Sequence, residues 1–203
     1  MEKELNKDTK SVLGLQLPTD PRWAEIAGKQ IEFILTDHAY CEQKAATTCI
    51  SLIVQYPDKK ELVERVSPLV TEEWGHFRMV LQELKKRGLN LGKQRKDEYV
   101  NQLLKSIRKG MGDYQLMDKL LVCALIEARS CERFKRLHEG LTEQDLKDFY
   151  YALMVSEAGH YKLFIELAEV YFDKQEVRDR WLQMLKIEAD IMKNLTPRGD
   201  RIH

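Results

Sequence analysis

Four long stretches of the chain carry apolar residues at every third or fourth position, which is the period of one face of an α-helix. These stretches cover residues 22–55, 59–87, 114–138 and 143–172. Shorter stretches with the same period cover residues 98–109 and 175–195, and no stretch has the alternation of a half-buried strand. Pro68 lies inside the second long stretch, where we expect a kink or a restart. The pattern predicts an all-α chain.

The connections between the long helices predict how they are arranged. Short turns join the first to the second and the third to the fourth, so each pair should form an antiparallel hairpin. Residues 88–113 contain four glycines and a short helical pattern, and they form a long crossover between the hairpins. A length of 203 residues suits one domain. We therefore predict a single four-helix-bundle domain over residues 1–203, with a long crossover connection and an additional C-terminal helix.

Two Glu-x-x-His motifs interrupt apolar stripes that are otherwise continuous. Glu73 and His76 lie on the second long helix, and Glu157 and His160 lie on the fourth. A spacing of three residues places a carboxylate and an imidazole one turn apart on the same helix face. One such motif could arise by chance, but two motifs that both face the core predict a shared site.

Each motif has a glutamate at the same depth on the neighbouring helix. Glu42 and Glu73 each stand fifteen residues from the turn at Pro57-Asp58. Glu127 and Glu157 are likewise about fifteen residues from the turn between the third and fourth helices. This separation corresponds to roughly 22 Å along a helix, so all four carboxylates should meet at one level. Glu132 would miss that level by five residues.

Four carboxylates in a hydrophobic core are costly unless protons, partners or metal ions compensate their charge. One glutamate from each of two helices and a Glu-x-x-His pair from each of the other two is the ligand set of ferritin-like di-iron and di-manganese bundles. We therefore predict a ferritin-like fold and a two-metal site. Its ligands would be Glu42, Glu73, His76, Glu127, Glu157 and His160.

Composition limits the other functions. The formal net charge is zero, so bulk charge does not indicate a nucleic acid, a membrane surface or an acidic partner. No apolar run reaches the roughly 20 residues of a membrane span, and the first 20 residues do not resemble a signal peptide. We expect a cytoplasmic protein. A Gly-rich dinucleotide motif and a cysteine set for an iron–sulfur cluster are both absent, so redox chemistry would need an external electron donor.

Other residues carry weaker signals. His38 lies on the inner side of the first helix and could orient a ligand, although a buried core histidine is an equal alternative. Gly75 and Gly159 precede the two motif histidines, which suggests close packing beside the site. A solvated surface is the default interpretation of the basic residues in the crossover and near the C-terminus: Lys93, Arg95, Lys96, Arg198 and Arg201.

Four segments resemble those of the tRNA 2-methylthio-N6-isopentenyladenosine hydroxylases, a family of non-haem di-iron monooxygenases. They are Asp37-His-Ala-Tyr-Cys-Glu-Gln-Lys-Ala-Ala46, Glu72-Glu-Trp-Gly-His-Phe77, Ile126-Glu-Ala-Arg-Ser-Cys-Glu-Arg-Phe134 and Ser156-Glu-Ala-Gly-His-Tyr161. The third is the most specific, because it exceeds what metal binding requires. The resemblance extends from about Leu13 to Ile202.

The resemblance implies an O2-dependent hydroxylase with two iron ions that acts on the isopentenyl side chain of a modified adenosine beside the tRNA anticodon. A reductase or a ferredoxin-type protein would supply electrons. No catalytic residue beyond the metal ligands is implied. Arg129, Glu132 and Arg133 become candidates for roles around the ligands or the substrate, and the five basic residues become candidates to hold tRNA phosphates.

Two other functions use the same ligand set. Iron storage or detoxification would predict a cage-forming oligomer that accumulates many irons per chain. Peroxide reduction is the second alternative, although the paired CxxC module that often accompanies it is absent from the sequence.

Overall fold

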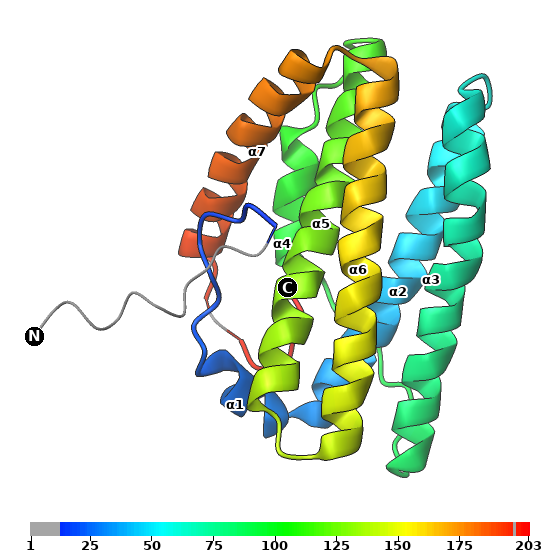
Figure 1. Ribbon diagram of the computed structural model, residues 1–203. Helices are drawn as coiled ribbons and strands as arrows, with labels where there is room; N and C mark the ends of the chain where they lie inside the picture. Colours follow the sequence, from blue (N-terminus) through cyan, green and yellow to red (C-terminus); the bar gives the residue numbers. More distant parts are fainter. Residues whose placement is uncertain (1–12, 197) are drawn as a thin grey trace, which may run out of the picture.

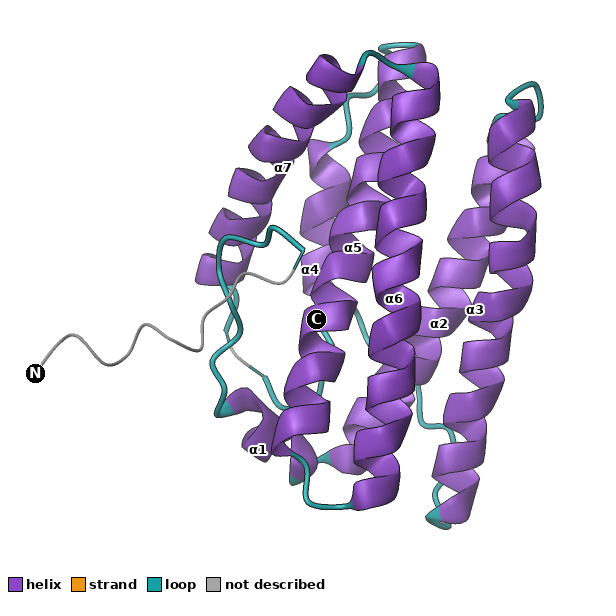
Figure 2. Ribbon diagram, in the orientation of Figure 1, coloured by secondary structure: helices purple, strands orange, loops and turns teal. Residues whose placement is uncertain are grey.

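The computed structural model describes residues 13–196 and 198–203, which form helices and short connections without a strand (Figure 2). The helices are α1 (Trp23–Gly28), α2 (Ile31–Gln55), α3 (Lys60–Lys86), α4 (Glu98–Leu103), the 3-10 helix η1 (Leu104–Ser106), α5 (Asp113–Gly140), α6 (Gln144–Tyr171) and α7 (Lys174–Asn194). The predicted all-α class is confirmed. Among the helices described, none has a stretch that is both long and apolar enough to cross a membrane.

The four long helices form two antiparallel hairpins, α2–α3 and α5–α6, that stand side by side (Figure 1). The crossover leads from the end of α3 to the start of α5 and contains α4. α7 runs along the outer side of α5 and also contacts α4 and α6. Asp97 and Asp173 accept hydrogen bonds from backbone N–H groups at the starts of α4 and α7, so both added helices have capped N-termini.

The first long helix is divided, contrary to the prediction of one helix from residue 22 to residue 55. The backbone leaves the helical conformation at Gln30, where φ is −129° and ψ is 36°. The break lets α1 turn and place Ala24 against the last residue of α5, Gly140. A Cβ atom on Gly140 would lie 2.6 Å from the Ala24 Cβ, so this close approach requires glycine.

Two other predictions about helices concern Pro68 and the end of the crossover helix. α3 continues through Pro68 without a restart, because Pro68 lies on the exposed face, where water can satisfy the carbonyl that loses its partner. The helical pattern predicted to reach residue 109 ends at Ser106. There the chain turns so that the backbone N–H and guanidinium of Arg108 bind the buried carboxylate of Asp118 at 2.8 and 2.7 Å.

The hydrophobic core is divided into two clusters by a polar layer. On α2, Leu35 belongs to one cluster and Leu52 to the other, with Glu42 between them. The same order occurs on α6, where Glu157 lies between Leu153 and Phe164. α3 and α5 repeat this arrangement. All four long helices thus present an acidic residue at the level where the two apolar clusters meet.

Candidate metal centre and adjoining cavities

The polar layer between the two hairpins consists of glutamates and histidines, and we call it the metal layer because these are metal-binding residue types. α2 and α5 contribute one glutamate each, and α3 and α6 contribute one Glu-x-x-His pair each. The six residues are Glu42, Glu73, His76, Glu127, Glu157 and His160, and their exposed fractions lie between 1% and 8%. The structure therefore places together the four glutamates that the hairpin spacing assigned to one level and the two motif histidines.

Glu73 and Glu157 lie between the two histidines. Glu73 Oε2 is 3.8 Å from His76 Nδ1, and Glu73 Oε1 is 2.9 Å from His160 Nδ1. Glu157 Oε1 is 4.0 Å from His76 Nδ1, and Glu157 Oε2 is 3.7 Å from His160 Nδ1. Each carboxylate directs one oxygen toward each imidazole, which is the arrangement that a ligand bridging two cations requires.

The remaining glutamates complete two groups of donors. Ligand atoms of Glu42, Glu73, His76 and Glu157 lie within 4.8 Å of one another. Ligand atoms of Glu73, Glu127 and His160 form a second group by the same measure. The groups share Glu73, so the layer offers two adjacent positions for metal ions.

Several buried atoms of this layer make no hydrogen bond of good geometry to a described residue, although Glu73 Oε1 and His160 Nδ1 lie within ion-pair distance of each other. The atoms are both carboxylate oxygens of Glu73, Oε1 of Glu157, and the Nδ1 atoms of His76 and His160. Leaving a buried polar group without a partner costs roughly 1–3 kcal/mol, and more when it is charged. These atoms point toward one another, so cations placed among them would satisfy all five. The residues therefore fit a metal centre.

Without metal, protons balance the charge of the layer. Burial raises the pKa of Glu42 and Glu127 well above the usual range, and repulsion from Glu157 adds to the shift at Glu127. Burial alone would lower the pKa of both motif histidines, but the surrounding carboxylates outweigh it. The pKa of His76 rises to about 10 and that of His160 to about 11. Metal binding would displace these protons.

Glu72 and Ser156 contact the outer edges of both imidazoles. Ser156 Oγ lies 3.4 Å from His76 Nε2 and 3.3 Å from His160 Nε2, and it donates to Glu72 at 2.7 Å. Glu72 Oε1 is also 3.2 Å from His160 Nε2. Such contacts fix the imidazole orientation and leave Nδ1 for the metal. Neither residue is predicted from the sequence, where the one signal is that each directly precedes a motif glutamate.

His38 holds the Glu42 carboxylate in place. Its Nε2 is 2.7 Å from Glu42 Oε1, and its ring packs on Phe134 and Tyr150 with centroids 4.7 and 5.6 Å away. Burial lowers the pKa of His38 to about 3, so the imidazole is neutral near pH 7, and its Nε2 shares a hydrogen bond with Glu42. These contacts support the prediction that His38 orients a ligand.

Arg129, Glu132 and Arg133 lie on the side of α5 that faces away from the metal layer. Arg129 binds Glu188 of α7 at 2.6 Å, and Glu132 accepts hydrogen bonds from the backbone and side chain of Thr19 at 3.0 and 2.5 Å. Arg133 stacks on Trp23 of α1. Arg129 and Glu132 therefore fasten the N-terminal segment and α7 to the bundle, and they do not support the ligands.

The five basic residues proposed for tRNA contacts divide into two groups. Lys93 and Lys96 are exposed. Arg95 and Arg198 bind the Asp200 carboxylate at 2.8 and 2.9 Å, and the Arg201 guanidinium lies 3.4 Å from it. Arg95 also donates to two backbone carbonyls. Arg95 thus ties the C-terminal segment to the crossover, while Arg198 and Arg201 pair within that segment.

Gly75 and Gly159 do not pack closely against a neighbour, contrary to the expectation. A Cβ atom added to either residue would meet no other group within 4 Å. Gly159 is exposed and Gly75 is half-buried, so neither position requires glycine for a close approach.

A small cavity of about 70 Å³ begins at the metal layer. Glu127 forms part of its wall, and the rest is largely apolar, with Cys49, Val100, Ile126 and Phe164 among the lining residues. The cavity therefore leads from one predicted ligand toward the space between α2, α4 and α5.

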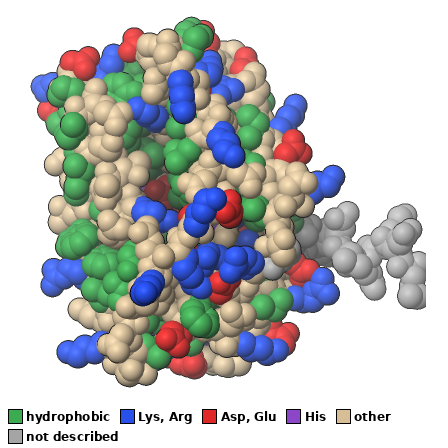
Figure 3. Space-filling view, turned by 180° about the vertical axis from the view of Figure 1, so that it is seen from behind, with side chains coloured by type: hydrophobic (Ala, Val, Ile, Leu, Met, Phe, Trp, Pro, Cys, Tyr) green, Lys and Arg blue, Asp and Glu red, His purple; other side chains and the backbone are tan. Residues whose placement is uncertain are grey.

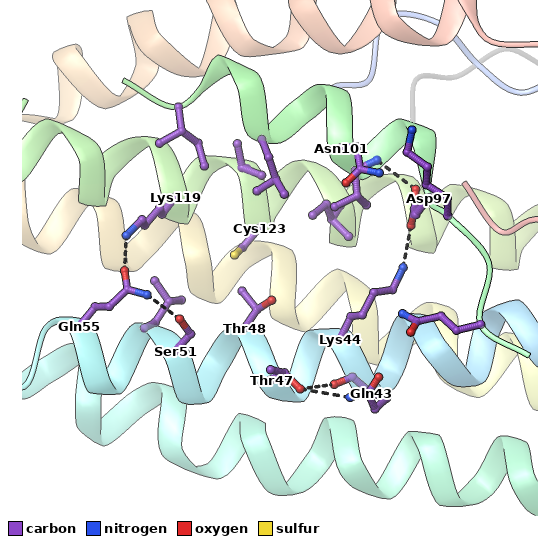
Figure 4. A pocket seen from close by; sticks show the side chains of 18 of the residues that line it. Gln43, Lys44, Thr47, Thr48, Ser51, Gln55, Asp97, Asn101, Lys119 and Cys123 are labelled. Atoms are coloured by element: carbon purple, nitrogen blue, oxygen red, sulfur yellow. Dashed lines mark hydrogen bonds and ion pairs between the residues drawn. The ribbon is translucent and has the colours of Figure 1, made fainter. Parts of the chain in front are cut away.

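A larger groove of about 800 Å³ continues from this cavity toward solvent. The two share several lining residues, including Lys44, Thr48, Asp97 and Cys123, whose side chains are labelled in Figure 4. Lys44 binds Asp97 at 2.9 Å across the groove. The opposite face of the molecule from that in Figure 1 is hollowed near its middle, with lysine and arginine side chains beside the hollow (Figure 3).

The groove differs in chemistry from the inner cavity. Its lining includes four basic side chains and four side-chain amides: Lys44, Arg95, Lys96, Lys119, Gln43, Gln55, Gln94 and Asn101. Amides can donate and accept hydrogen bonds, as recognition of a nucleobase edge requires. The passage therefore becomes less polar from the surface toward the metal layer.

The fold and the donor set together define a ferritin-like four-helix bundle with a carboxylate- and histidine-rich candidate metal site. A Synechococcus protein described as having aldehyde deformylating oxygenase activity has the same fold. It superimposes with a TM-score of 0.88 and 34% identity, over 93% of this chain and 94% of that one.

The sequence comparisons identify the family within this class. The family model described as tRNA-(MS2IO6A)-hydroxylase (MiaE) matches residues 7–203. A Pseudomonas putida protein named tRNA 2-(methylsulfanyl)-N(6)-isopentenyladenosine(37) hydroxylase is 40% identical over 80% of this chain and 78% of its own length. A Salmonella typhimurium protein of the same name is 29% identical over 88% of this chain and 83% of its own length. The chain belongs to this tRNA hydroxylase family.

Proposed function

We propose that this protein hydroxylates the isopentenyl side chain of 2-methylthio-N6-isopentenyladenosine in tRNA, with two iron ions as the cofactor and O2 as the co-substrate. The observation that carries the proposal is the apolar cavity that runs from Glu127 into a groove lined by amides and basic residues. Family membership supports the same reaction and does not support iron storage.

The cavity and groove match the two parts of this substrate. The isopentenyl group is apolar and would enter the inner cavity, where Ile126 and Phe164 exclude water from the site of oxidation. The adenine and ribose would remain in the groove, where amides such as Asn101 can bind the base edge. The modified nucleotide would have to leave the anticodon stack to reach this position.

The six side chains of the metal layer would hold the two ions. Glu42, Glu73, His76 and Glu157 would hold one ion, and Glu73, Glu127 and His160 would hold the other. Carboxylate-rich ligation with open coordination positions suits O2 activation by iron, and the two electrons for each turnover would come from a reductase or ferredoxin-type donor. The protein's own contribution is to orient the ligands through His38 and Ser156, to position the side chain and to exclude water.

Metal-dependent stability tests the cofactor. A ligand at about 1,000 times its Kd stabilises a protein by about 4 kcal/mol, which corresponds to a rise in Tm of roughly 8–16 °C for a domain of this size. Anaerobic Fe(II) should raise the Tm of the metal-free protein by this order and should not raise that of Glu73→Gln.

Glu83 provides a matched control on the same helix. It is also buried, but Lys86 and Arg87 bind its two oxygens at 2.5 and 2.6 Å, so it has no need of a metal. Glu83→Gln should lower the stability of both forms and keep the iron-dependent rise in Tm. Equal responses in Glu73→Gln and the wild type would contradict the metal assignment.

The substrate is tested by mass spectrometry of nucleosides from tRNA of cells with and without this protein. The hydroxylated isopentenyladenosine should be absent without the protein and restored by the wild type, whereas Glu157→Ala should not restore it. An unchanged hydroxylated pool in cells without the protein would refute the substrate while leaving the metal site intact.

A further inference from the structure

Arg133 of α5 is a buried arginine with no acidic partner in the described part of the chain. Its exposed fraction is 6%, and its Nε and Nη1 atoms are buried without a hydrogen bond. Two neighbouring arginines take the nearby carboxylates. Arg129 binds Glu188 at 2.6 Å and Glu132 at 3.1 Å, and Arg136 binds Glu132 at 3.3 Å. The positive charge of Arg133 therefore remains without direct compensation.

The environment of Arg133 keeps this charge in place. Burial lowers the pKa of Arg133 to about 10, so its guanidinium is still protonated at neutral pH. The guanidinium lies 4.3 Å from the centre of the Trp23 ring, and the resulting cation–π attraction offsets part of the cost of burial. Removing a charge from water without pairing it costs several kcal/mol, so an anionic ligand would stabilise this arrangement.

Arg133 lines a cavity of about 530 Å³ between the N-terminal segment, the crossover and the end of α7. The lining includes five cationic side chains: Lys96, Arg133, Lys193, Arg198 and Arg201. The two acidic residues in the lining are already paired, Asp20 with Arg22 at 2.5 Å and Glu98 with Lys96 at 2.9 Å. Arg198 and Arg201 bind Asp200, which does not line the cavity, so Arg133 and Lys193 are the lining arginine and lysine without an acidic partner among the described residues, and they lie in the same cavity as the rings of Trp23 and Tyr99.

We infer that this cavity binds a phosphodiester group of the RNA next to the modified nucleoside, with Arg133 as its buried contact. The inference rests on the proposed function. Phosphate is the anion that the planar guanidinium fits best, because its oxygens can accept two parallel N–H donors. Lys96 lines both this cavity and the outer groove, so the two sites lie on either side of the crossover. One RNA strand could occupy both.

The inference is tested with Arg133→Met in the iron-loaded protein. A fluorescent anticodon stem-loop RNA carrying the modified adenosine should bind the variant about tenfold or more weakly, because one charged hydrogen bond is lost. The slope of log K against log salt should become shallower by about one, as expected for the loss of one phosphate contact. In turnover, the ratio of kcat/KM for the stem-loop to kcat/KM for the free nucleoside should fall by a similar factor.

Arg136→Met is the matched control, because Arg136 is equally buried on the same helix but is paired with Glu132 and does not line the cavity. It should keep the wild-type salt slope. Arg133→Lys preserves the charge and should recover part of the affinity, which keeps the test valid if Arg133→Met is poorly folded.

Three results would overturn the inference. They are a wild-type RNA affinity and salt slope in Arg133→Met, equal losses for the stem-loop and the free nucleoside, or Arg133-dependent binding of free AMP that is as tight as that of the stem-loop. The last result would assign the cavity to a free nucleotide. Failure of the proposed function is a separate outcome, in which the wild type hydroxylates neither the nucleoside nor the stem-loop although iron is bound.

Discussion

Filling the inner cavity should abolish hydroxylation without removing the metal centre. Cys123 lies on α5 at the passage between the groove and the cavity, and its side chain lines both (Figure 4). The cavity holds only about 70 Å³, so the benzyl group of Cys123→Phe would occupy the space that the isopentenyl group needs. Thr48→Phe would block the same passage from α2.

The expected magnitude follows from the apolar area of the substrate. Burial of one CH2 group contributes about 0.8 kcal/mol, so a five-carbon side chain gains roughly 4 kcal/mol in the cavity. Losing this contribution corresponds to a decrease of about 10³-fold in kcat/KM. The assay is hydroxylation of the free nucleoside by the iron-loaded protein under excess reductant, with iron content and Tm measured in parallel.

Ile50→Phe is the control for Thr48→Phe. Ile50 is two residues further along α2, is half exposed, and lines neither the cavity nor the groove. It should turn over the nucleoside at the wild-type rate. The proposed position of the isopentenyl group is refuted if both blocking variants bind iron and hydroxylate the nucleoside as fast as the wild type.

Three further predictions concern other parts of the structure. Gly159→Ala should raise the free energy of unfolding by about 1 kcal/mol, because alanine favours the helix and its Cβ meets nothing, whereas Gly140→Ala should lower it through the clash with Ala24; urea unfolding measures both. Ser156→Ala should weaken metal binding at least about tenfold in competition with a chelator, because both imidazoles lose an outer contact. His203 and Lys44 hold the pKa of Asp97 below its usual value, although burial alone would raise that pKa. Asp97→Asn should therefore lower the free energy of unfolding at neutral pH and make its decrease in acid less steep.

The sign of the Asp97 prediction follows from linkage. A carboxyl with a lowered folded-state pKa stabilises the fold above its unfolded pKa of about 3.9, and this contribution is lost as pH falls through the folded value. Asparagine cannot titrate, so the free energy of unfolding should decrease less steeply below about pH 4. The Asp97 prediction is contradicted if the free energy of unfolding of Asp97→Asn falls in acid as steeply as that of the wild type. Equal stabilities of the two glycine variants would contradict the packing argument, and an unchanged metal affinity in Ser156→Ala would contradict the role of its outer contact.

The helical bundle and the level of the six metal-layer residues could be predicted because both depend on local rules. The helical period fixes which face of each helix is buried, and the turns fix the depth of Glu42 against Glu73. The sequence-based predictions were wrong where the structure depends on contacts between distant segments of the chain. α1 turns at Gln30 so that Ala24 can reach Gly140, and the sequence near residue 30 does not contain that information.

The prediction that Arg129 and Glu132 act around the ligands or the substrate differs from the structure for a related reason. A helix turns by roughly 100° per residue, so residues two and five positions after Glu127 project to other faces of α5. Burial of those faces depends on α7 and the N-terminal segment, which cover α5 from outside the bundle. Glu72 and Ser156 were missed for a similar reason, since their contact depends on the distance between α3 and α6.

The polar layer also sets the register of the bundle and thereby the position of the substrate passage. A slip of one turn would move Glu127 or Glu157 into one of the two apolar clusters, where a carboxylate has no partner and its burial is strongly unfavourable. The metal layer thus fixes how α5 stands against α2. In that register Cys123 and Ile126 face the cavity just before Glu127. The cavity therefore meets the candidate metal site at Glu127, and a side chain in the cavity would lie next to this predicted ligand, while Glu72 and Ser156 contact the outer edges of the imidazoles.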